Sequence, residues 1–390
     1  MISPVMPTYA RADLAFDKGE GVYLYATDGK RYLDFGGGIA VTGLGHCHPH
    51  LIKALSRQAG RLWHYSNLYQ IPEQTRLAER LVEASFADSV FFNNSGAEAV
   101  ETSIKMARKY HDAQGHPERY RVVTCEGAFH GRTLATIAAG GQEKHLAGFG
   151  PVVDGFDQVA FGNLNEMRAA IGPETAAILV EPVQGEGGIR PMSLDYLKGL
   201  RDIADEFAIL LMLDEVQCGM GRTAKLFAHE WAGIEPDVLA TAKGLGGGFP
   251  VGACLAKEGP AAAMTAGSHG STFGGNPLAM AVGNAVLDII LGDGFLAHVD
   301  AVARRLWSRL EDLSEKYPSV FEGASGAGLM VGLKCLSENS AIVEKCADRG
   351  LLLVAAGDNM VRMVPPLIIE DAHVDEALEI LEKAAGELAE

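Results

Sequence analysis

The chain has 390 residues, of which 50 are acidic and 33 basic, so its formal net charge is −17. This length suits two unequal lobes better than one ordinary core, and 48% hydrophobic residues is typical of a globular protein. The acidic excess and the lack of a basic stripe argue against a nucleic-acid partner. A small anionic substrate stays compatible, because one or two local arginines can hold it.

Targeting signals and metal motifs are not evident in the sequence. The N-terminus lacks a basic start followed by an apolar core, and no stretch approaches the roughly 20 apolar residues of a membrane span. The six cysteines form no C-x-x-C pair, which indicates reduced thiols. The histidines of GHCHPH (45–50) have no acidic partner nearby, so no metal site is expected. We predict a cytoplasmic protein without a membrane partner.

In chain order, short apolar runs alternate with amphipathic helical stretches between residues 89 and 259. Helices are expected over 98–111 and 194–207. Buried strands alternating with helices predict an α/β fold with a mostly parallel sheet covered on both faces. The expected strands cover residues 89–93, 121–125, 176–181, 209–215, 237–241 and 251–256.

A smaller α+β lobe is expected after a helical run over 276–291. Its predicted helices cover 299–317 and 371–389, and its predicted strands cover 328–335, 351–355 and 361–364. We therefore predict a large domain over 46–298 and a small domain over 299–390, with residues 1–45 contributing to the small domain.

Polar and glycine-rich segments follow five of the predicted strands. In open α/β sheets, ligands bind beyond the carboxyl ends of the strands, so these segments are expected to meet in one crevice. They are NNSGAE, EGAFHGR, EPVQGEGG, DEVQCGMGR and AKGLGGG.

Two residues in these segments suggest a pyridine cofactor. Asp214 ends an apolar strand, where an unpaired carboxylate is costly, so it either caps or pairs locally or holds a cation such as a protonated ring nitrogen. Lys243 lies among apolar and glycine residues, a setting that lowers the pKa of an amine and favours a nucleophile. No G-x-G-x-x-G or Walker pattern competes with this interpretation.

Other segments could bind anions. Ser95, Gly96 and Ala97 precede a predicted helix, and exposed amides at a helix start suit a phosphate, whether or not Ser95 is also a plain cap. Arg132 and Arg362 lie beside apolar segments, and they either form structural ion pairs with an acid such as Glu186 or recognise a carboxylate.

Taken together, these strings resemble the class III aminotransferases of pyridoxal 5′-phosphate (PLP) fold type I from about residue 19 to residue 382. The resemblance implies a PLP-dependent transaminase with a seven-stranded type of sheet in its large domain. It is carried by NSGAEAVE (94–101), AFHGRT (128–133), EPVQGEGG (181–188), DEVQCGMGRTA (214–224), AKGLGGGFP (242–250), HGSTFGGNP (269–277) and RMVPPL (362–367).

The resemblance also implies roles for single residues. Lys243 would hold PLP as a Schiff base and move the substrate proton, while Asp214 would hold the ring nitrogen and Gln217 the ring hydroxyl. The substrate carboxylate would be held by Arg132 and Ser271. The remaining cofactor contacts would come from Ser95, Gly96, Ala97, Phe129, Glu215, Val216 and Thr272, the last reaching the phosphate of a neighbouring subunit in a homodimer with shared active sites.

Within the family, the strings are most similar to enzymes acting on N2-acetylornithine and 2-oxoglutarate in arginine biosynthesis. Glu186 and Arg362 would then form a switch that accepts both substrates, because Arg362 needs a partner when the substrate offers only one carboxylate. Ornithine-specific relatives carry a tyrosine where this chain has Ile39, and an apolar residue suits an acylated nitrogen. Another ω-aminotransferase (acting on ornithine, succinylornithine, succinyldiaminopimelate or GABA) and a non-catalytic protein with this fold remain as alternatives.

Overall fold

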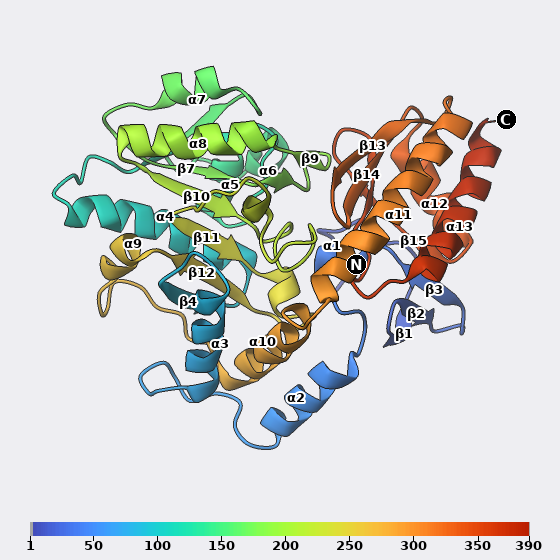
Figure 1. The fold of residues 1–390 in the computed structure, drawn as a ribbon, viewed down its shortest axis with the longest axis horizontal. Coiled ribbons are helices and arrows are strands. Elements are labelled where there is room, and N and C mark those ends of the chain that lie inside the picture. The colour runs from blue at the N-terminus through green and yellow to red at the C-terminus, as the bar shows by residue number, and fades with distance from the viewer. Residues whose placement is uncertain (1–2, 390) are drawn as a thin grey trace.

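A seven-stranded sheet organises the larger lobe (Figure 1). The computed structural model describes residues 3–389. Every strand of this sheet runs parallel to the others except β12, which is antiparallel to both neighbours, so the predicted mostly parallel sheet is confirmed. The strand order is β4 (Ser89–Asn93), β12 (Gly252–Ala256), β11 (Val238–Thr241), β10 (Leu210–Asp214), β7 (Thr175–Val180), β5 (Arg121–Cys125) and β6 (Phe156–Val159).

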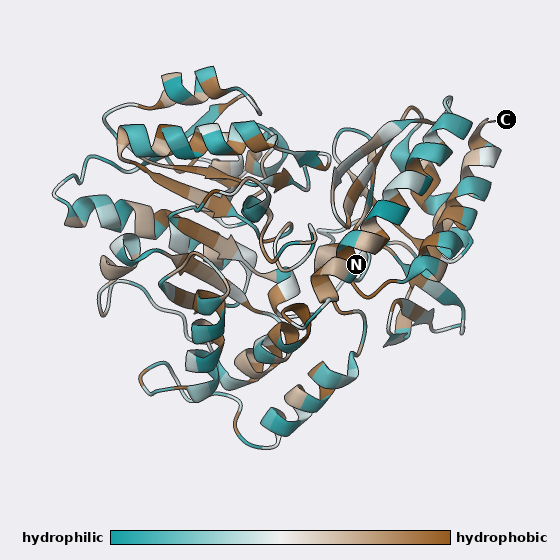
Figure 2. Ribbon diagram, in the orientation of Figure 1, coloured by the Kyte–Doolittle hydropathy of each residue, from teal (hydrophilic) through white to brown (hydrophobic). Residues whose placement is uncertain are grey.

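The central strands are buried on both faces because helices cover each side. Side chains alternate along a strand, so Ala177 and Leu179 of β7 pack with helix α4 (Gly96–Ala113). Ile178 and Val180 pack on the other side with helix α8 (Leu194–Phe207). The continuous apolar runs predicted from the sequence are therefore required by the two covered faces. Figure 2 shows the hydrophobic strands lying inside and the hydrophilic helix faces lying outside.

Shorter elements surround this sheet and the crevice. The helices are α2 (Pro49–Ala59), α3 (Pro72–Glu83), α5 (Leu134–Gly140), α6 (Glu143–Leu146), α7 (Leu164–Ala170), α9 (Glu258–Ala262) and α10 (Pro277–Ile290). Strands β8 (Val183–Gln184) and β9 (Arg190–Pro191) form a small ribbon, and single 3₁₀ turns cover Ala228–Trp231 and Lys243–Leu245.

The smaller lobe combines the C-terminal residues with the N-terminal strands. Its four-stranded antiparallel sheet has the order β13 (Phe321–Ala327), β14 (Met330–Cys335), β17 (Met360–Met363) and β16 (Val354–Ala356). Helices α11 (Phe295–Lys316), α12 (Asn339–Asp348) and α13 (Asp371–Ala389) pack beside it. A second sheet joins β1 (Phe16–Glu20), β2 (Tyr23–Ala26) and β3 (Arg31–Asp34) to β15 (Leu351–Leu352). The short helix α1 (Gly37–Ala40) lies between the lobes (Figure 1).

The predicted single strand over 351–355 is wrong. The chain changes partners after Leu352, because β15 pairs with β3 whereas β16 pairs with β17. Several strands were not predicted. β6 has few apolar residues, β13 has the glycine-rich sequence FEGASGA, and no strand was predicted at β1, β2, β3, β8 or β9. The domain boundaries at residues 45 and 298 stay predictions.

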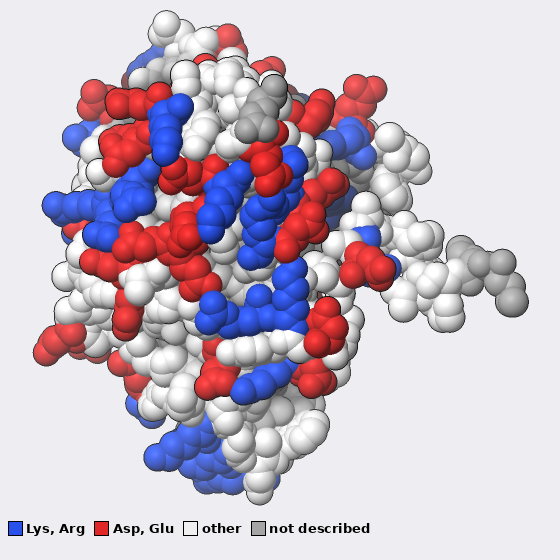
Figure 3. All heavy atoms as spheres, turned by 90° about the vertical axis from the view of Figure 1, so that its right-hand side faces the viewer, with Lys and Arg blue, Asp and Glu red and all other residues white. Residues whose placement is uncertain are grey.

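The outer face of the smaller lobe carries interleaved charges of both signs (Figure 3). Arg305 on α11 pairs with Asp375 on α13 at 2.7 Å, and Lys345 on α12 pairs with Glu387 at 2.9 Å. Such exposed pairs contribute about 0–1 kcal/mol each, so they hold the helices in register only weakly.

No single helix within residues 3–389 is long and apolar enough to cross a membrane, although α10 and α11, bent by 70° at their junction, pass the length and composition test as a pair.

Replacing Ile178 with alanine should destabilise the larger lobe. The side chain is fully buried in the central strand β7, so the cavity should lower the free energy of unfolding by about 2–5 kcal/mol. Thermal unfolding should show a clear fall in melting temperature. The control is Leu194→Ala, at a position 46% exposed, which should change little. Equal shifts for the two variants would contradict this account of the core.

Candidate active site

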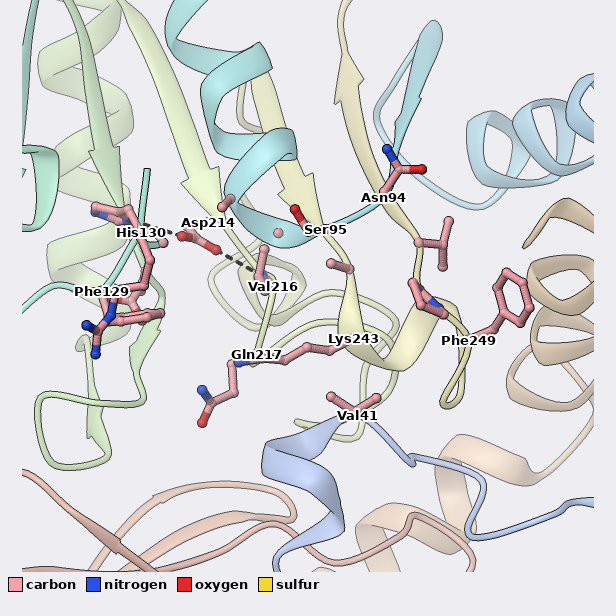
Figure 4. A pocket seen from close by; sticks show the side chains of 18 of the residues that line it. Val41, Asn94, Ser95, Phe129, His130, Asp214, Val216, Gln217, Lys243 and Phe249 are labelled. Atoms are coloured by element: carbon pink, nitrogen blue, oxygen red, sulfur yellow. Dashed lines mark hydrogen bonds and ion pairs between the residues drawn. The ribbon is translucent and has the colours of Figure 1, made fainter. Parts of the chain in front are cut away.

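The polar segments that follow the strands meet in one cavity of about 430 Å³. Residues after β4, β5, β7, β10 and β11 all contribute to its wall, as the strand-end argument predicts. Figure 4 shows Asp214, Val216, Gln217 and Lys243 around this space, with helix α1 on its far side. The cavity therefore lies at the carboxyl edge of the sheet, facing the smaller lobe.

Asp214 is held in place by two hydrogen bonds. Its Oδ1 accepts from the backbone N of Val216 at 3.0 Å, and its Oδ2 lies 2.8 Å from Nδ1 of His130 (Figure 4). Both side chains are buried, Asp214 being 4% exposed. Burial alone would lower the pKa of His130, but the hydrogen bond and the charge of Asp214 raise it. His130 is thus a close partner for the buried Asp214 carboxylate, which has room for a further N–H donor.

Glu181 is a second acid in the cavity wall, at the end of β7. Its carboxylate accepts from the backbone N of Phe129 at 2.8 Å and from that of Gly185 at 3.3 Å, so it ties the loops after β5 and β7 together. Burial raises the pKa of Glu181, while the charge of His130 opposes the rise. His130 therefore bonds to Asp214 and also feels the charge of Glu181, and its Nε2 has no hydrogen-bond partner among residues 3–389.

Lys243 begins a 3₁₀ turn directly after β11 and faces the cavity. Burial lowers the pKa of its amine to about 8, and the positive charge of Arg362 acts in the same direction. Its φ of 42° lies in the left-handed region, which is uncommon for a residue with a side chain. An amine with a pKa lowered to about 8 is neutral far more often than an ordinary lysine, so Lys243 is suited to act as a nucleophile.

The start of α4 forms an anion cradle. The Oγ atom of Ser95 accepts from the backbone N of Glu98 at 3.3 Å, which leaves the hydroxyl hydrogen free to donate, and the Gly96 and Ala97 segment lines the cavity. A Cβ atom on Gly96 would lie 2.6 Å from Val216, so only glycine fits here. Amides at the start of this 18-residue helix face the cavity with the positive end of its dipole.

Three further predicted residues line the same cavity. Val216 and Phe129 come from different loops and present apolar groups to it, and the guanidinium of Arg132 lies 5.5 Å from the ring centre of Phe129. The cavity therefore offers apolar surfaces for a flat ring, with a cation at its edge.

Glu186 and Arg362 form an ion pair beside the cavity. Nη1 of Arg362 lies 2.6 Å from Oε1 of Glu186 and donates to Oε1 of Gln217 at 3.2 Å. Arg362 is 1% exposed, whereas Glu186 is 30% exposed. Burial alone would raise the pKa of Glu186, but the charge and hydrogen bond of Arg362 hold it below its usual range. Gln217 lines the cavity, so it connects the ion pair with the space next to Lys243.

Five predicted residues do not line the cavity. Glu186 and Arg362 form the ion pair beside it, and the other three are Glu215, Ser271 and Thr272. The carboxylate of Glu215 is fully buried and accepts from the backbone N of His229 at 3.0 Å, so it stabilises the turn over Ala228–Trp231. Oγ of Ser271 accepts from the side chain of Asn94 at 3.1 Å. Thr272 is exposed on the same loop. Within one chain, the structure therefore does not bring Glu215, Ser271 or Thr272 to the cavity.

No group of three or more His, Cys, Asp or Glu side chains suited to a metal ion occurs in the described part of the chain.

The sequence argument missed two residues of this centre, His130 and Glu181. Both lie in the polar segments that follow strands. The sequence around a histidine or an acid in such a segment does not show whether its side chain pairs with another residue or faces solvent. The signal that could have found them is position, because each follows a parallel strand of the same sheet and lies at the edge where Asp214 and Lys243 also lie.

The model of the aminotransferase class-III family matches residues 6–385 of the chain. The chain belongs to this family. It is 60% identical over 388 residues to the acetylornithine aminotransferase of Mesorhizobium japonicum, a match that covers 100% of this chain and 97% of that protein.

Solved structures agree with the fold. An N-acetylornithine aminotransferase from Stenotrophomonas maltophilia K279a is 37% identical, with a TM-score of 0.86 and 97% coverage of each chain. An amine transaminase from an uncultivated Pseudomonas species in its PLP-bound form is 29% identical, with a TM-score of 0.92 and coverage of 99% of this chain and 98% of that chain. The class-III aminotransferase described here is a PLP-dependent enzyme with the fold predicted from its sequence.

The cavity fits PLP on the observations above. A buried carboxylate at Asp214 suits a ring nitrogen that carries a proton, the start of α4 suits a phosphate, and Lys243 suits an aldehyde. The assignment of each residue to a particular cofactor atom remains a prediction.

The lowered pKa of Lys243 can be measured directly. In protein stripped of cofactor, acetic anhydride should label Lys243 half-maximally near pH 8, because the neutral amine is available above its pKa of about 8. Exposed lysines should show midpoints near the ordinary value of about 10.4. Peptide mass spectrometry across pH gives each midpoint. Arg362→Gln should move the midpoint of Lys243 upwards, since it removes a neighbouring cation; an unchanged midpoint would contradict this cause.

Proposed function

We propose that this enzyme transfers the terminal amino group of N2-acetyl-L-ornithine to 2-oxoglutarate. The products are N-acetyl-L-glutamate 5-semialdehyde and L-glutamate. The observation that carries the proposal is the buried Arg362, paired with a partly exposed Glu186 beside the cavity that holds Lys243 and Asp214. The names of the relatives with high identity over the full chain support the same substrate.

The two substrates differ in charge where they meet Arg362. Glutamate and 2-oxoglutarate carry two carboxylates, so one can pair with Arg132 and the other with Arg362. N-acetylornithine carries one carboxylate and a neutral amide, so Glu186 must stay on Arg362 to avoid an unpaired buried charge. Because Glu186 is 30% exposed, it can leave the pair without itself being stranded in the interior.

Each cavity residue then has a defined task. PLP, when bound, supplies an electron sink for the carbon that loses its proton. Lys243 holds the cofactor and moves that proton at Nζ, since its lowered pKa lets the amine act as a base. Asp214, held in place by His130, would accept from the ring nitrogen of the bound cofactor. Ser95, Gly96 and Ala97 bind the phosphate, and Phe129 and Val216 orient the ring.

The active form is inferred to be a homodimer with shared sites. Thr272 is exposed and does not line the cavity of its own chain, although the family resemblance assigns it to a phosphate. The next residue, Phe273, is an exposed large apolar side chain at 61%. Leu68, exposed at 87%, follows Asn67, whose side chain donates to the carbonyl of Ser271 at 3.1 Å. Ser271 would complete the substrate site from the same loop. The cytoplasmic location stays a prediction.

A panel of amino donors tests the proposed substrate. Purified enzyme with 2-oxoglutarate should show its highest kcat/KM with N-acetylornithine, ahead of ornithine, succinylornithine and GABA. Ile39 gives the physical reason, because an apolar residue suits an acylated nitrogen better than a free ammonium. Lys243→Ala should abolish turnover with every donor. A higher kcat/KM with ornithine would reject the proposal.

Removing Glu186 should separate the two half-reactions. In Glu186→Ala, N-acetylornithine meets an unpaired buried Arg362, whereas glutamate supplies its own carboxylate. Single-turnover rates measured by absorbance should fall at least about 10-fold more for N-acetylornithine than for glutamate. Glu311→Ala, an exposed acid on α11, is the control and should change neither rate. Equal losses for the two donors would contradict the switch.

A further inference from the structure

Helix α1 is a left-handed turn. Its four residues Gly37, Gly38, Ile39 and Ala40 have φ values of 51°, 59°, 63° and 62°. Val41 N donates back to the carbonyl of Gly37 at 2.8 Å, so the turn is closed by its own backbone hydrogen bonds. L-residues visit this region singly, and a run of them is disfavoured because Cβ approaches the following carbonyl. Glycine is free of that penalty, but Ala40 and the β-branched Ile39 are not.

A buried acid fixes the start of this turn. Oδ1 of Asp34 accepts from the backbone N of Gly36 at 3.0 Å and from that of Gly37 at 2.9 Å. Its Oδ2 lies 2.8 Å from Nε2 of His46, which comes from beyond the turn. Asp34 is 3% exposed, so these bonds are made away from solvent. One carboxylate therefore joins the first amides of the turn to the chain that follows it.

The smaller lobe holds the turn from the other side. The carbonyl of Phe35 accepts from the backbone N of Val364 at 2.8 Å, two residues after the buried Arg362. A Cβ on Gly37 would lie 2.5 Å from the carbonyl oxygen of Val364, so the segment after β17 is in close contact with the turn. Ala40 is buried in a small apolar cluster that also contains Val364. The turn is thus enclosed by contacts that can maintain an unfavourable backbone.

The left-handed turn delivers a residue to the active site. Val41, which follows it directly, lines the cavity, and Figure 4 shows it at the end of α1 facing the side chain of Lys243. A right-handed turn would send the chain in a different direction and remove Val41 from the wall. Function therefore depends on the hand of the turn, which the sequence of Ile39 and Ala40 does not favour.

We propose that Asp34 and His46 are positioning residues that hold the left-handed turn Gly37–Ala40, and with it Val41, as a fixed wall of the amino-donor pocket. The proposal rests on the proposed function, because it places the donor in the cavity next to Lys243. Neither residue touches the reacting atoms. They act by keeping the wall in one conformation before the donor binds.

A cycle of variants separates backbone strain from side-chain loss. Asp34→Ala is made in three backgrounds, which are the unmodified chain, Ile39→Gly and, as the matched control, Ile39→Ala. Both substitutions at this position remove the isoleucine side chain, but only glycine removes the penalty for a positive φ. Asp34→Ala should raise the KM for N-acetylornithine about 10-fold or more in the unmodified and Ile39→Ala backgrounds, and less than about 3-fold in the Ile39→Gly background. The kcat and the PLP absorbance should change little.

Three results would overturn the proposal. The first is an equal rise in the KM for N-acetylornithine in all three backgrounds. The second is a fall in kcat with no change in KM, and the third is a loss of bound PLP. Should Asp34→Ala fail to fold, His46→Ala takes its place in the same cycle, because it removes only the bond to Oδ2.

Melting temperature provides a test without any substrate. Asp34→Ala should lower the melting temperature by several degrees more in the unmodified and Ile39→Ala backgrounds than in the Ile39→Gly background. Equal falls in all three backgrounds would contradict the proposal that Asp34 holds the left-handed turn. If the unmodified enzyme proved inactive with N-acetylornithine, the proposed function would fail, while this measurement would still test whether Asp34 holds the left-handed turn.

Discussion

The structure depends on keeping several charges buried at one edge of a parallel sheet. An isolated buried charge is far too costly to persist, so each must find a partner or change its protonation state. Asp214 pairs with His130, and Arg362 pairs with Glu186. Burial lowers the pKa of Lys243 to about 8. The segments after strands β5, β7, β10 and β11 bring His130, Glu186, Asp214 and Lys243 to this edge, and β17 of the smaller lobe supplies Arg362. The reactivity of the lysine is therefore a consequence of how the neighbouring charges are balanced.

This balance also joins the two lobes. Arg362 belongs to β17 of the smaller lobe, yet both of its hydrogen-bond partners, Glu186 and Gln217, belong to the larger one. A few residues along the chain, Val364 bonds to Phe35 and so reaches α1. Any displacement of the smaller lobe would change the pairing of a buried arginine and the position of Val41 at once. The crevice is thus closed by polar contacts with specific geometry, whereas each lobe is held mainly by its own apolar core.

Much of the fold could be predicted from the sequence, because strands buried on both faces leave continuous apolar runs and amphipathic helices keep their period. The helix Leu194–Phe207 was predicted to the residue. The strand β13 could not be found, since its stability comes from pairing with β14 and not from its glycine-rich sequence. Asp214 and Lys243 stood out through their apolar surroundings, but His130 did not, because its partner is 84 residues away along the chain. The left-handed turn could not be predicted either. Its two glycines permit a positive φ, but the turn is held by the bonds of Asp34 and by the contact with Val364.

The two sides of the cavity differ in how freely their residues can move. An enzyme that takes a dicarboxylate and a longer monocarboxylate in turn needs one side that can change its charge pattern and another that keeps the reacting carbon in place. In the proposed switch Glu186 changes its position, which its partial exposure and its single side-chain ion pair allow. Val41 cannot change its position, because reversing the hand of α1 would require breaking the bonds of Asp34 and removing Ala40 from its cluster. A residue held by strain that its surroundings impose is a better fixed point than a flexible one, since no nearby conformation of similar energy is available to it.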